Sequence, residues 1–143
     1  MAFFMNIFPF NDRRDDISFE ANLNSFINKS VESGFKKTLI TIGDKRYDPW
    51  VVAQYALQVN KNFGPVIAVN PVHQHPVALI KKLTSLQNLY ATDISLNLIT
   101  GSFINELSSI GDKLSLSERT DRLREFIKIS EDLLSSDSTY SFG

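Results

Sequence analysis

The 143-residue sequence contains no cysteine. This absence excludes a disulfide framework, a zinc site built on thiolates and a cysteine nucleophile. No stretch reaches the roughly 18 consecutive apolar residues that a membrane-spanning helix requires. The apolar N-terminus, MAFFMNIFPF, has neither a basic region before it nor a small-residue cleavage site, which favours a first core strand over a signal peptide. Together these absences predict a cytoplasmic protein that uses no membrane as a partner.

The sequence also lacks an excess of charge of either sign. It has 15 basic and 16 acidic residues, for a net charge of −1. No basic stripe or aromatic platform is present, so nucleic acid is not an expected partner. The 43 % apolar and 22 % charged residues are typical of a soluble globular protein. The length suffices for one domain with a hydrophobic core.

The residues that are present alternate between strand-like and helix-like patterns. Short apolar or β-branched runs, bounded by glycine, proline or asparagine, predict strands. Apolar residues at helical spacing predict the helices between them. The predicted strands are residues 6–10, 38–42, 66–69 and 94–98, and the predicted helices are residues 19–33, residues 49–63, a segment from 76 through 89, residues 103–110 and a long segment that starts at Ser117-Glu118.

Several of the predicted helices are expected to bury an apolar side. The inward residues predicted for the helix that starts at Pro76 are Leu79, Ile80, Leu83, Leu86 and Leu89. Those predicted for the long last helix are Leu123, Phe126, Ile127, Ile129, Leu133 and Leu134. Trp50, at the start of the second helix, is expected to pack that helix against the sheet.

Regular alternation of strands and helices predicts parallel strands joined by helical crossovers. Two α/β architectures fit such apolar strands, a doubly wound sheet and a (β/α) barrel. Neither a GxGxxG nor a P-loop fingerprint, which would favour the doubly wound sheet, is present. An eight-unit barrel usually needs roughly 250 residues. The sequence supplies about four strand–helix units, about half of such a barrel.

The stretch ISLNLITGS at residues 94–102 is the strongest candidate for a ligand site. A strand there leads into Thr100, Gly101 and Ser102, where hydroxyls, backbone N–H groups and a helix N-terminus converge. In the alternative interpretation, Ser102 only caps the following short helix.

Three other positions have both a functional and a structural interpretation. Asn70 follows an apolar strand and either faces a ligand or ends the strand before Pro71. Arg46 either binds an anion through two guanidinium N–H groups or is solvated. His73 and His75 have no acidic or cysteine neighbour that would complete a metal site, so loop structure is favoured and no metal is expected.

The order and spacing of several motifs resemble the N-terminal half of the bacterial luciferase-like, flavin-dependent monooxygenases, and within that family the alkanesulfonate monooxygenases. The resemblance covers about residues 18–129. The matching motifs are Asp48-Pro49-Trp50, His75-Pro76, Thr84-Ser85-Leu86, the run Leu96 to Ser102, Asn105-Glu106-Leu107, Ser117-Glu118-Arg119 and Glu125-Phe126.

The resemblance implies the N-terminal half of a TIM-type (β/α)8 barrel, about four parallel strands with crossover helices, in one partial domain over residues 1–143 that is incomplete at its C-terminus. It implies reduced FMN as cofactor, delivered by a flavin reductase, and O2-dependent cleavage of a C–S bond in an organosulfonate. Thr100, Gly101, Ser102 and Asn70 would then face the flavin, and Arg46 the substrate.

Several positions depart from the family pattern. Arg46 stands where the alkanesulfonate enzymes have a cysteine, and Leu116 and Thr120 replace a His and a Tyr that contact the flavin phosphate or ribityl chain. The family's principal His and Arg lie beyond Gly143, so catalytic residues are unassigned. Arg119 is expected to pair with a carboxylate such as Glu118 or Asp121.

These departures leave two hypotheses. In the first, the chain is a truncated or split monooxygenase, completed by self-association or by a complementary half-barrel. In the second, it is a catalytically degenerate remnant that serves as a binding or interaction module.

Overall fold

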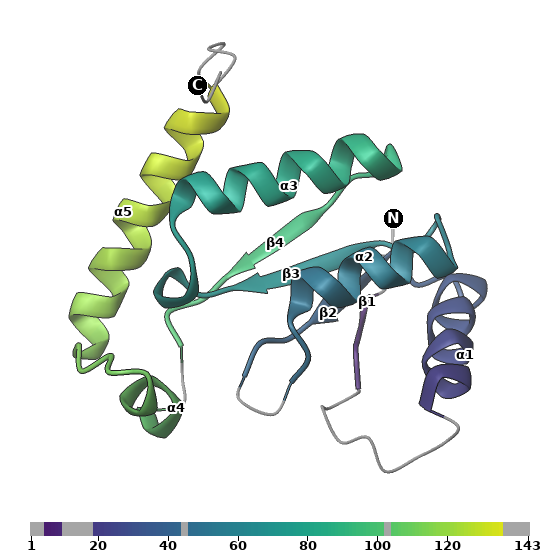
Figure 1. Ribbon diagram of the computed structural model, residues 1–143, viewed down its shortest axis with the longest axis horizontal. Helices are drawn as coiled ribbons and strands as arrows, with labels where there is room; N and C mark the ends of the chain where they lie inside the picture. Colours follow the sequence, from purple (N-terminus) through teal and green to yellow (C-terminus); the bar gives the residue numbers. More distant parts are fainter. Residues whose placement is uncertain (1–4, 10–18, 44–45, 102–103, 136–143) are drawn as a thin grey trace.

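The computed structural model describes residues 5–9, 19–43, 46–101 and 104–135. Within these residues four strands form one parallel sheet in the order β1-β2-β3-β4, as Figure 1 shows. The strands are β1 (Met5–Ile7), β2 (Lys37–Ile40), β3 (Pro65–Val69) and β4 (Ser95–Leu98). The α/β fold with parallel strands and helical crossovers, predicted from the alternating pattern, is therefore confirmed.

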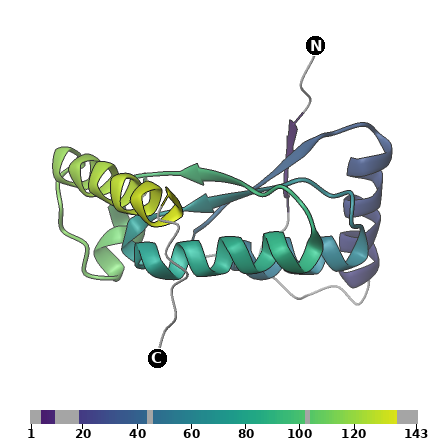
Figure 2. The same cartoon turned by 90° about the horizontal axis from the view of Figure 1, so that it is seen from above.

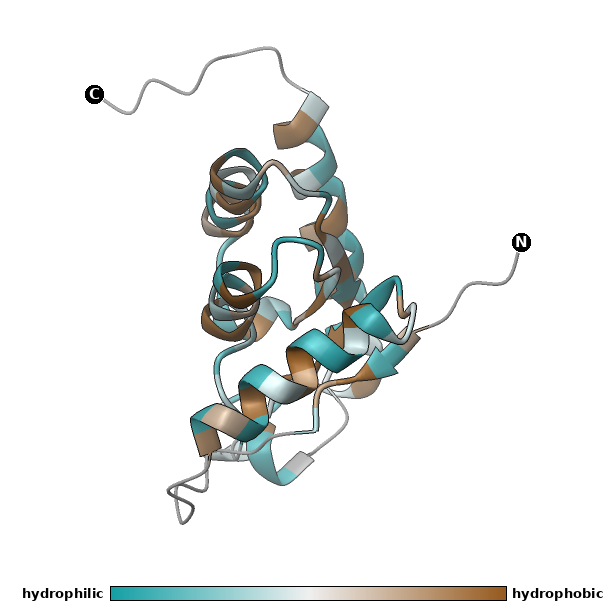
Figure 3. Cartoon of the chain, turned by 90° about the vertical axis from the view of Figure 1, so that its right-hand side faces the viewer, coloured by the Kyte–Doolittle hydropathy of each residue, from teal (hydrophilic) through white to brown (hydrophobic). Residues whose placement is uncertain are grey.

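Helices follow the strands in regular alternation. They are α1 (Phe19–Glu32), α2 (Pro49–Val59), α3 (Pro76–Tyr90), α4 (Ile104–Ser109) and α5 (Leu116–Ser135), with a 3₁₀ turn η1 (Pro71–His73) between β3 and α3. Figure 2 shows that α2 and α3 cover the same face of the sheet. Figure 3, which views the molecule from the side of α1, shows apolar and polar residues alternating along that helix.

Strand pairing fixes which residues face the helices. Ile40 is opposite Ile67, and both are buried in the core together with Ile27 of α1 and Ala53 of α2. Because side chains alternate along a strand, the adjacent pair Leu39 and Val66 faces the other way.

The helix-facing side of β1 and β2 also carries a polar network. Thr38 Oγ1 donates to Asn6 Oδ1 at 2.6 Å, and Asn6 Nδ2 donates to Ser30 Oγ at 2.9 Å. Ser30 Oγ in turn donates to the carbonyl of Phe26 at 2.8 Å. Each buried polar group in this network has a partner, so the network positions α1 against β1 and β2 without an unsatisfied group.

Two strand and helix ends differ from the prediction. The first strand was predicted to run over residues 6–10, but β1 is Met5–Ile7. Beyond it the Phe8 N–H still bonds to the Leu39 carbonyl at 2.8 Å, and Pro9 then has no N–H to continue the ladder. The second helix was predicted to reach residue 63, but it ends at Val59 because Asn60 is extended.

The start of the last helix was also misplaced. It was predicted at Ser117, but α5 starts at Leu116 and Ser115 is its cap. Ser115 Oγ accepts from the Glu118 N–H at 3.3 Å, while a Glu118 carboxylate oxygen accepts from the Ser115 N–H at 2.8 Å. This reciprocal arrangement is a capping box, and it lowers the pKa of Glu118 through the hydrogen bonds from Ser115.

Some residues predicted to be inward are not. Leu89 is 76 % exposed, and in α5 Ile129 and Leu134 are exposed while Phe126 is buried. The two helices therefore bury narrower apolar stripes than their sequences predicted. Trp50 is buried in the core, as predicted, and Lys82 Nζ lies 5.6 Å from the centre of its ring.

Part of the sheet face opposite α2 and α3 is apolar. Register places Ile7, Leu39 and Val66 in one row that continues to Ser95 on β4, and the Ile7 side chain is 58 % exposed. None of the helices in the described ranges is both long enough and apolar enough to cross a membrane.

Candidate functional site

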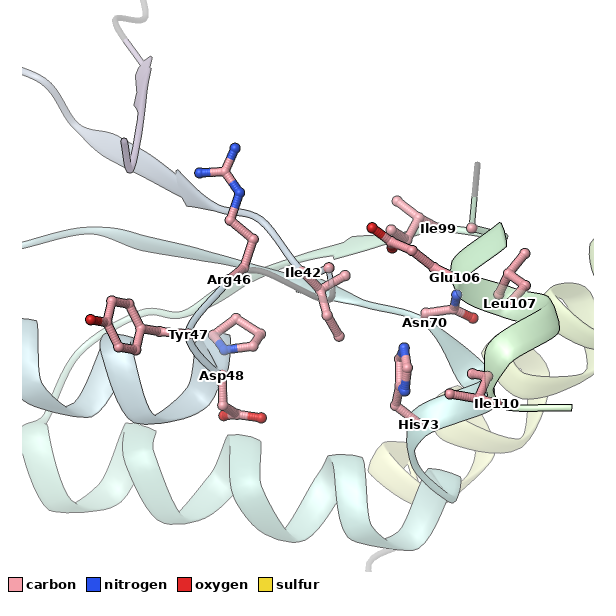
Figure 4. Close-up of a pocket in the computed structure, with 13 residues that line it drawn as sticks. Ile42, Arg46, Tyr47, Asp48, Asn70, His73, Ile99, Glu106, Leu107 and Ile110 are labelled. Carbon is pink, nitrogen blue, oxygen red and sulfur yellow. The ribbon is translucent and has the colours of Figure 1, made fainter. Parts of the chain in front are cut away.

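A cavity of about 340 Å³ lies at the carboxyl ends of β2, β3 and β4. Residues that follow each of these strands line it, since Ile42 and Gly43 come after β2, Asn70 after β3, and Ile99 and Gly101 after β4. The other lining residues come from the loop before α2, from α2 itself, from η1, and from α4 and its end: Arg46, Tyr47, Asp48, Pro49, His73, Glu106, Leu107 and Ile110 (Figure 4). The volume is in the range of small-molecule sites, and the carboxyl edge of a parallel sheet is where such sites occur.

Gly101 brings backbone to the cavity wall where no side chain fits. Its φ is +83°, and a Cβ at this position would lie 2.7 Å from Asn70 Nδ2 and 3.1 Å from a methyl carbon of Leu107. Glycine is required there on both grounds, because other L-residues disfavour this φ and the Cβ would collide.

Asn70 ends β3 and lines the cavity at the same time. The residue is 3 % exposed, and its Oδ1 accepts from the Val72 N–H at 3.2 Å, which caps η1. Its amide nitrogen lies on the Gly101 side, and Figure 4 shows the amide beside Leu107 and above His73. The two interpretations of Asn70 are therefore compatible in this geometry.

Charged groups lie on the same cavity. Asp48 is already engaged, because one carboxylate oxygen accepts from the N–H groups of Trp50 and Val51 at the start of α2. The Glu106 carboxylate lies above Gly43, where a Cβ would be 3.5 Å from both of its oxygens. Figure 4 shows Arg46 at the end of the cavity away from Asn70. The cavity thus carries one guanidinium and two carboxylates, with the Asn70 amide away from Arg46.

The structure does not place the remaining predicted site residues on the cavity wall. Thr100 is half-buried and is not among the residues that line the cavity. Ser102 lies outside the described residues. His75 caps α3, its Nδ1 accepting from the Val77 N–H at 3.3 Å, as its structural interpretation required. The described part of the chain holds no cluster of three metal-ligating side chains.

The sequence did not assign a cavity role to His73, Glu106, Leu107 or Ile110. Three of these belong to α4 or its end, and α4 follows β4 directly. The position of this helix directly after a predicted strand could have indicated the role, because such a helix brings its first turns to the carboxyl edge of the sheet.

The contact made by Arg119 differs from the predicted one. It was expected to pair with Glu118 or Asp121, but its Nη1 donates to the carbonyl of Gly101 at 3.0 Å, and the residue is buried. Glu118 instead belongs to the capping box, and Asp121 pairs with Arg124 at 2.8 Å. The start of α5 at Leu116 places Arg119 in the first turn, on the side that faces the turn after β4.

One ion pair joins α5 to the loop after α4. Arg122 Nη2 lies 2.6 Å from Asp112 Oδ2, and the Asp112 side chain is 3 % exposed. The hydrogen bond from Arg122 lowers the pKa of Asp112 below its ordinary 3.8, with the backbone N–H of Leu114 contributing. Since the folded pKa is depressed, the pair contributes stability above about pH 4, and that stability is lost as the pH falls through the lower folded pKa.

We expect Asp112→Asn to reduce the free energy of unfolding at pH 7 by about 1–2 kcal/mol, because Arg122 loses its carboxylate partner. The difference between the variant and the wild type should shrink below pH 4, where the wild-type carboxyl also becomes protonated. Urea unfolding at pH 3, 4, 5 and 7 measures this. Asp121→Asn, the same change at an exposed ion pair, is the control, and a difference that is constant with pH would contradict the prediction.

Comparisons with known proteins all match monooxygenases. Residues 26–143 match the luciferase-like monooxygenase family. A curated relative from Niallia circulans, the 4-(gamma-L-glutamylamino)butanoyl-[BtrI acyl-carrier protein] monooxygenase BtrO, is 35 % identical over 95 residues. That alignment covers 66 % of this chain and 28 % of the relative, so the chain spans little more than a quarter of that protein.

Two solved structures share the fold. The EDTA monooxygenase of Chelativorans sp. BNC1 has a TM-score of 0.74 at 15 % identity, over 92 % of this chain and 38 % of that one. The oxygenating constituent of 3,6-diketocamphane monooxygenase from Pseudomonas putida, a type II Baeyer–Villiger enzyme solved with FMN, has a TM-score of 0.75 at 20 % identity, over 93 % of this chain and 39 % of that one.

Proposed function

Since this chain belongs to the luciferase-like monooxygenase family, we propose that it forms one wall of the active site of a flavin-dependent monooxygenase. The observation that carries the proposal is the cavity at the carboxyl ends of β2, β3 and β4, with Asn70 and Gly101 on its wall. The chain covers less than two fifths of the monooxygenase structures that share its fold. We therefore propose that residues 1–143 form a single partial barrel domain.

The residues around the cavity fit a flavin. A Cβ on Gly101 would collide with Asn70 Nδ2 and Leu107, so only glycine lets the backbone pack against these two residues of the wall. The Asn70 amide nitrogen can donate a hydrogen bond to a flavin oxygen or ring nitrogen, while its oxygen stays on Val72 N–H. Ile42, Ile99 and Leu107 exclude water from this wall. Reduced FMN, when bound, supplies the electrons that activate O2.

The substrate we propose is an organic anion, with an organosulfonate cleaved at its C–S bond as the specific case. The Arg46 side chain on the cavity supports this, because a guanidinium can bind a sulfonate or carboxylate through two parallel hydrogen bonds. Thr100 and Ser102 stay candidates for flavin contact on the strength of the family resemblance alone.

The partners follow from this chemistry. A flavin reductase would supply reduced FMN, because the electrons that activate O2 have to reach the flavin from a separate donor. The exposed row through Ile7 would be covered by a second copy of the chain or by a complementary half-barrel, which would also close the cavity.

A second candidate function is a non-catalytic binding module. Leu116 and Thr120 support it, because they stand at positions where the resemblance expects a His and a Tyr toward the flavin, and Leu116 is 62 % exposed. A module of this kind would keep the fold without the redox chemistry.

Anaerobic titration with reduced FMN separates the two functions. We expect saturable binding, followed by absorbance or fluorescence, and loss of affinity in Asn70→Leu. The chain should be titrated alone and together with any complementary half. Saturable binding that Asn70→Leu weakens supports the monooxygenase, whereas no binding in either setting would overturn it in favour of the module.

A further inference from the structure

We propose that Arg119 is a positioning residue that holds the turn after β4 in the conformation needed at the cavity, so that the affinity for flavin depends on a side chain that does not line the cavity. This inference rests on the proposed function. It assigns to α5 a role in the site that is distinct from the His and Tyr positions discussed above.

The turn is held at both ends. On one side, Ile99 N–H donates to the Val69 carbonyl at 2.9 Å and extends the pairing of β3 with β4. On the other side, Arg119 Nη1 donates to the Gly101 carbonyl at 3.0 Å. Between these two bonds the chain reaches the positive φ of Gly101. Without the guanidinium, one end of the turn would lose its anchor.

The same bond also fixes Asn70 indirectly. A Cβ on Gly101 would lie 2.7 Å from Asn70 Nδ2, so the Gly101 backbone and the Asn70 amide are closely packed. Movement of Gly101 would either open a gap beside Asn70 or push its amide. Arg119 therefore controls the placement of Gly101 and Asn70 without lining the cavity itself.

Burial of the Arg119 guanidinium would cost free energy without return if the side chain only packed against its neighbours. It is 7 % exposed, and its Nε is buried with no hydrogen-bond partner in the described parts of the chain. The nearby carboxylate of Asp112 hydrogen-bonds to Arg122, not to Arg119. Because an apolar side chain would avoid the desolvation of a buried guanidinium, packing alone does not explain Arg119, and the bond to Gly101 does.

The element that carries Arg119 is itself anchored. Helix α5 packs along α3 and contacts η1, which Asn70 caps. Asp112 holds α5 a turn further along through Arg122. Because α5 is held in place, the backbone of Arg119 is fixed, and its guanidinium can hold another group in position.

The test compares Arg119→Met with Arg124→Met in the full chain, since the Arg124 side chain lies on the same helix but is 73 % exposed. Both variants replace a guanidinium with an apolar side chain of similar length on the same helix, but only the first loses the bond to Gly101. Arg119→Lys keeps a positive charge and a donor, and serves as the second variant if Arg119→Met does not fold. The measurements are anaerobic binding of reduced FMN and hydrogen exchange of the Ile99 amide.

We expect Arg119→Met to weaken binding of reduced FMN at least tenfold and to accelerate exchange at Ile99, with α3 amides unchanged. Arg124→Met should change the affinity less than twofold, and Arg119→Lys should fall between Arg119→Met and the wild type. Equal losses of affinity in the two Met variants, or unchanged exchange at Ile99, would overturn the proposal.

The outcomes separate this proposal from the proposed function. If the wild type fails to bind reduced FMN, the proposed function is wrong, and exchange at Ile99 alone decides whether Arg119 holds the turn. Faster exchange confined to the turn supports that role, and exchange that rises throughout α3 and α5 overturns it, because Arg119 would then act on the whole fold.

Discussion

Gly64→Ala is expected to destabilise the fold by about 3 kcal/mol or more. A Cβ on Gly64 would lie 2.0 Å from the carbonyl oxygen of Lys36, which is backbone and cannot rotate away. The Gly64 carbonyl also accepts from Thr38 N–H at 2.8 Å, so a shift of this residue disturbs the pairing of β2 with β3. The pair lies at the centre of the sheet, and its loss affects every layer.

Urea unfolding of Gly64→Ala against Gly34→Ala measures this effect. Gly34 has a φ of +82°, but no other group lies within 4 Å of the place that a Cβ would take. Alanine there therefore costs only the backbone strain, about 1–2 kcal/mol. Gly64 has no positive φ, so its loss reports the collision with Lys36, whereas Gly34→Ala reports backbone strain without a collision. A loss of stability in Gly64→Ala no larger than that in Gly34→Ala would contradict the prediction.

Gly101→Ala is expected to weaken binding of reduced FMN at least tenfold, which is about 1.4 kcal/mol. The added Cβ collides with Asn70 Nδ2 at 2.7 Å and meets Leu107 at 3.1 Å. Both neighbours line the cavity, so any relief of the collision moves the wall against which we propose that the flavin lies. Anaerobic titration followed by flavin fluorescence gives the dissociation constant.

Gly111→Ala is the matched control for this variant. Gly111 has almost the same φ, +81°, and open space around a Cβ, and it lies just beyond α4. Alanine there adds the same backbone strain without touching the cavity wall, so the affinity should stay within about twofold of the wild type. Comparable losses of affinity in the two variants would contradict the assignment of Gly101 to the flavin wall.

The alternation of elements was predictable because it rests on local patterns. Asp48 followed by Pro49 predicted the start of α2, and the structure has Asp48 as the cap. The β-branched and apolar runs predicted β2 and β3 within one or two residues. Parallel pairing then followed from the helical crossovers, and parallel strands necessarily bring Asn70 and Gly101 to one edge of the sheet.

Features that depend on three-dimensional neighbours were not predictable from the pattern. Arg119 looked like one charge among many on α5, and only the packing of α5 near the turn after β4 reveals its bond to Gly101. Leu89 continued the apolar spacing of α3, yet it lies at the end of the helix, beyond the core. The start of α5 was placed at Ser117 and the capping box of Ser115 was missed, because both serines are followed by sequences that can start a helix.

Strand order has a consequence for how the chain folds. Every strand pairs with the strand that immediately precedes it in sequence, in the order β1-β2-β3-β4. A chain growing on the ribosome can therefore add each strand to an existing edge as that strand emerges, and no strand waits to be inserted between two others. Each pairing then needs the closure of only one strand–helix–strand unit, so the sheet can assemble stepwise from the N-terminus.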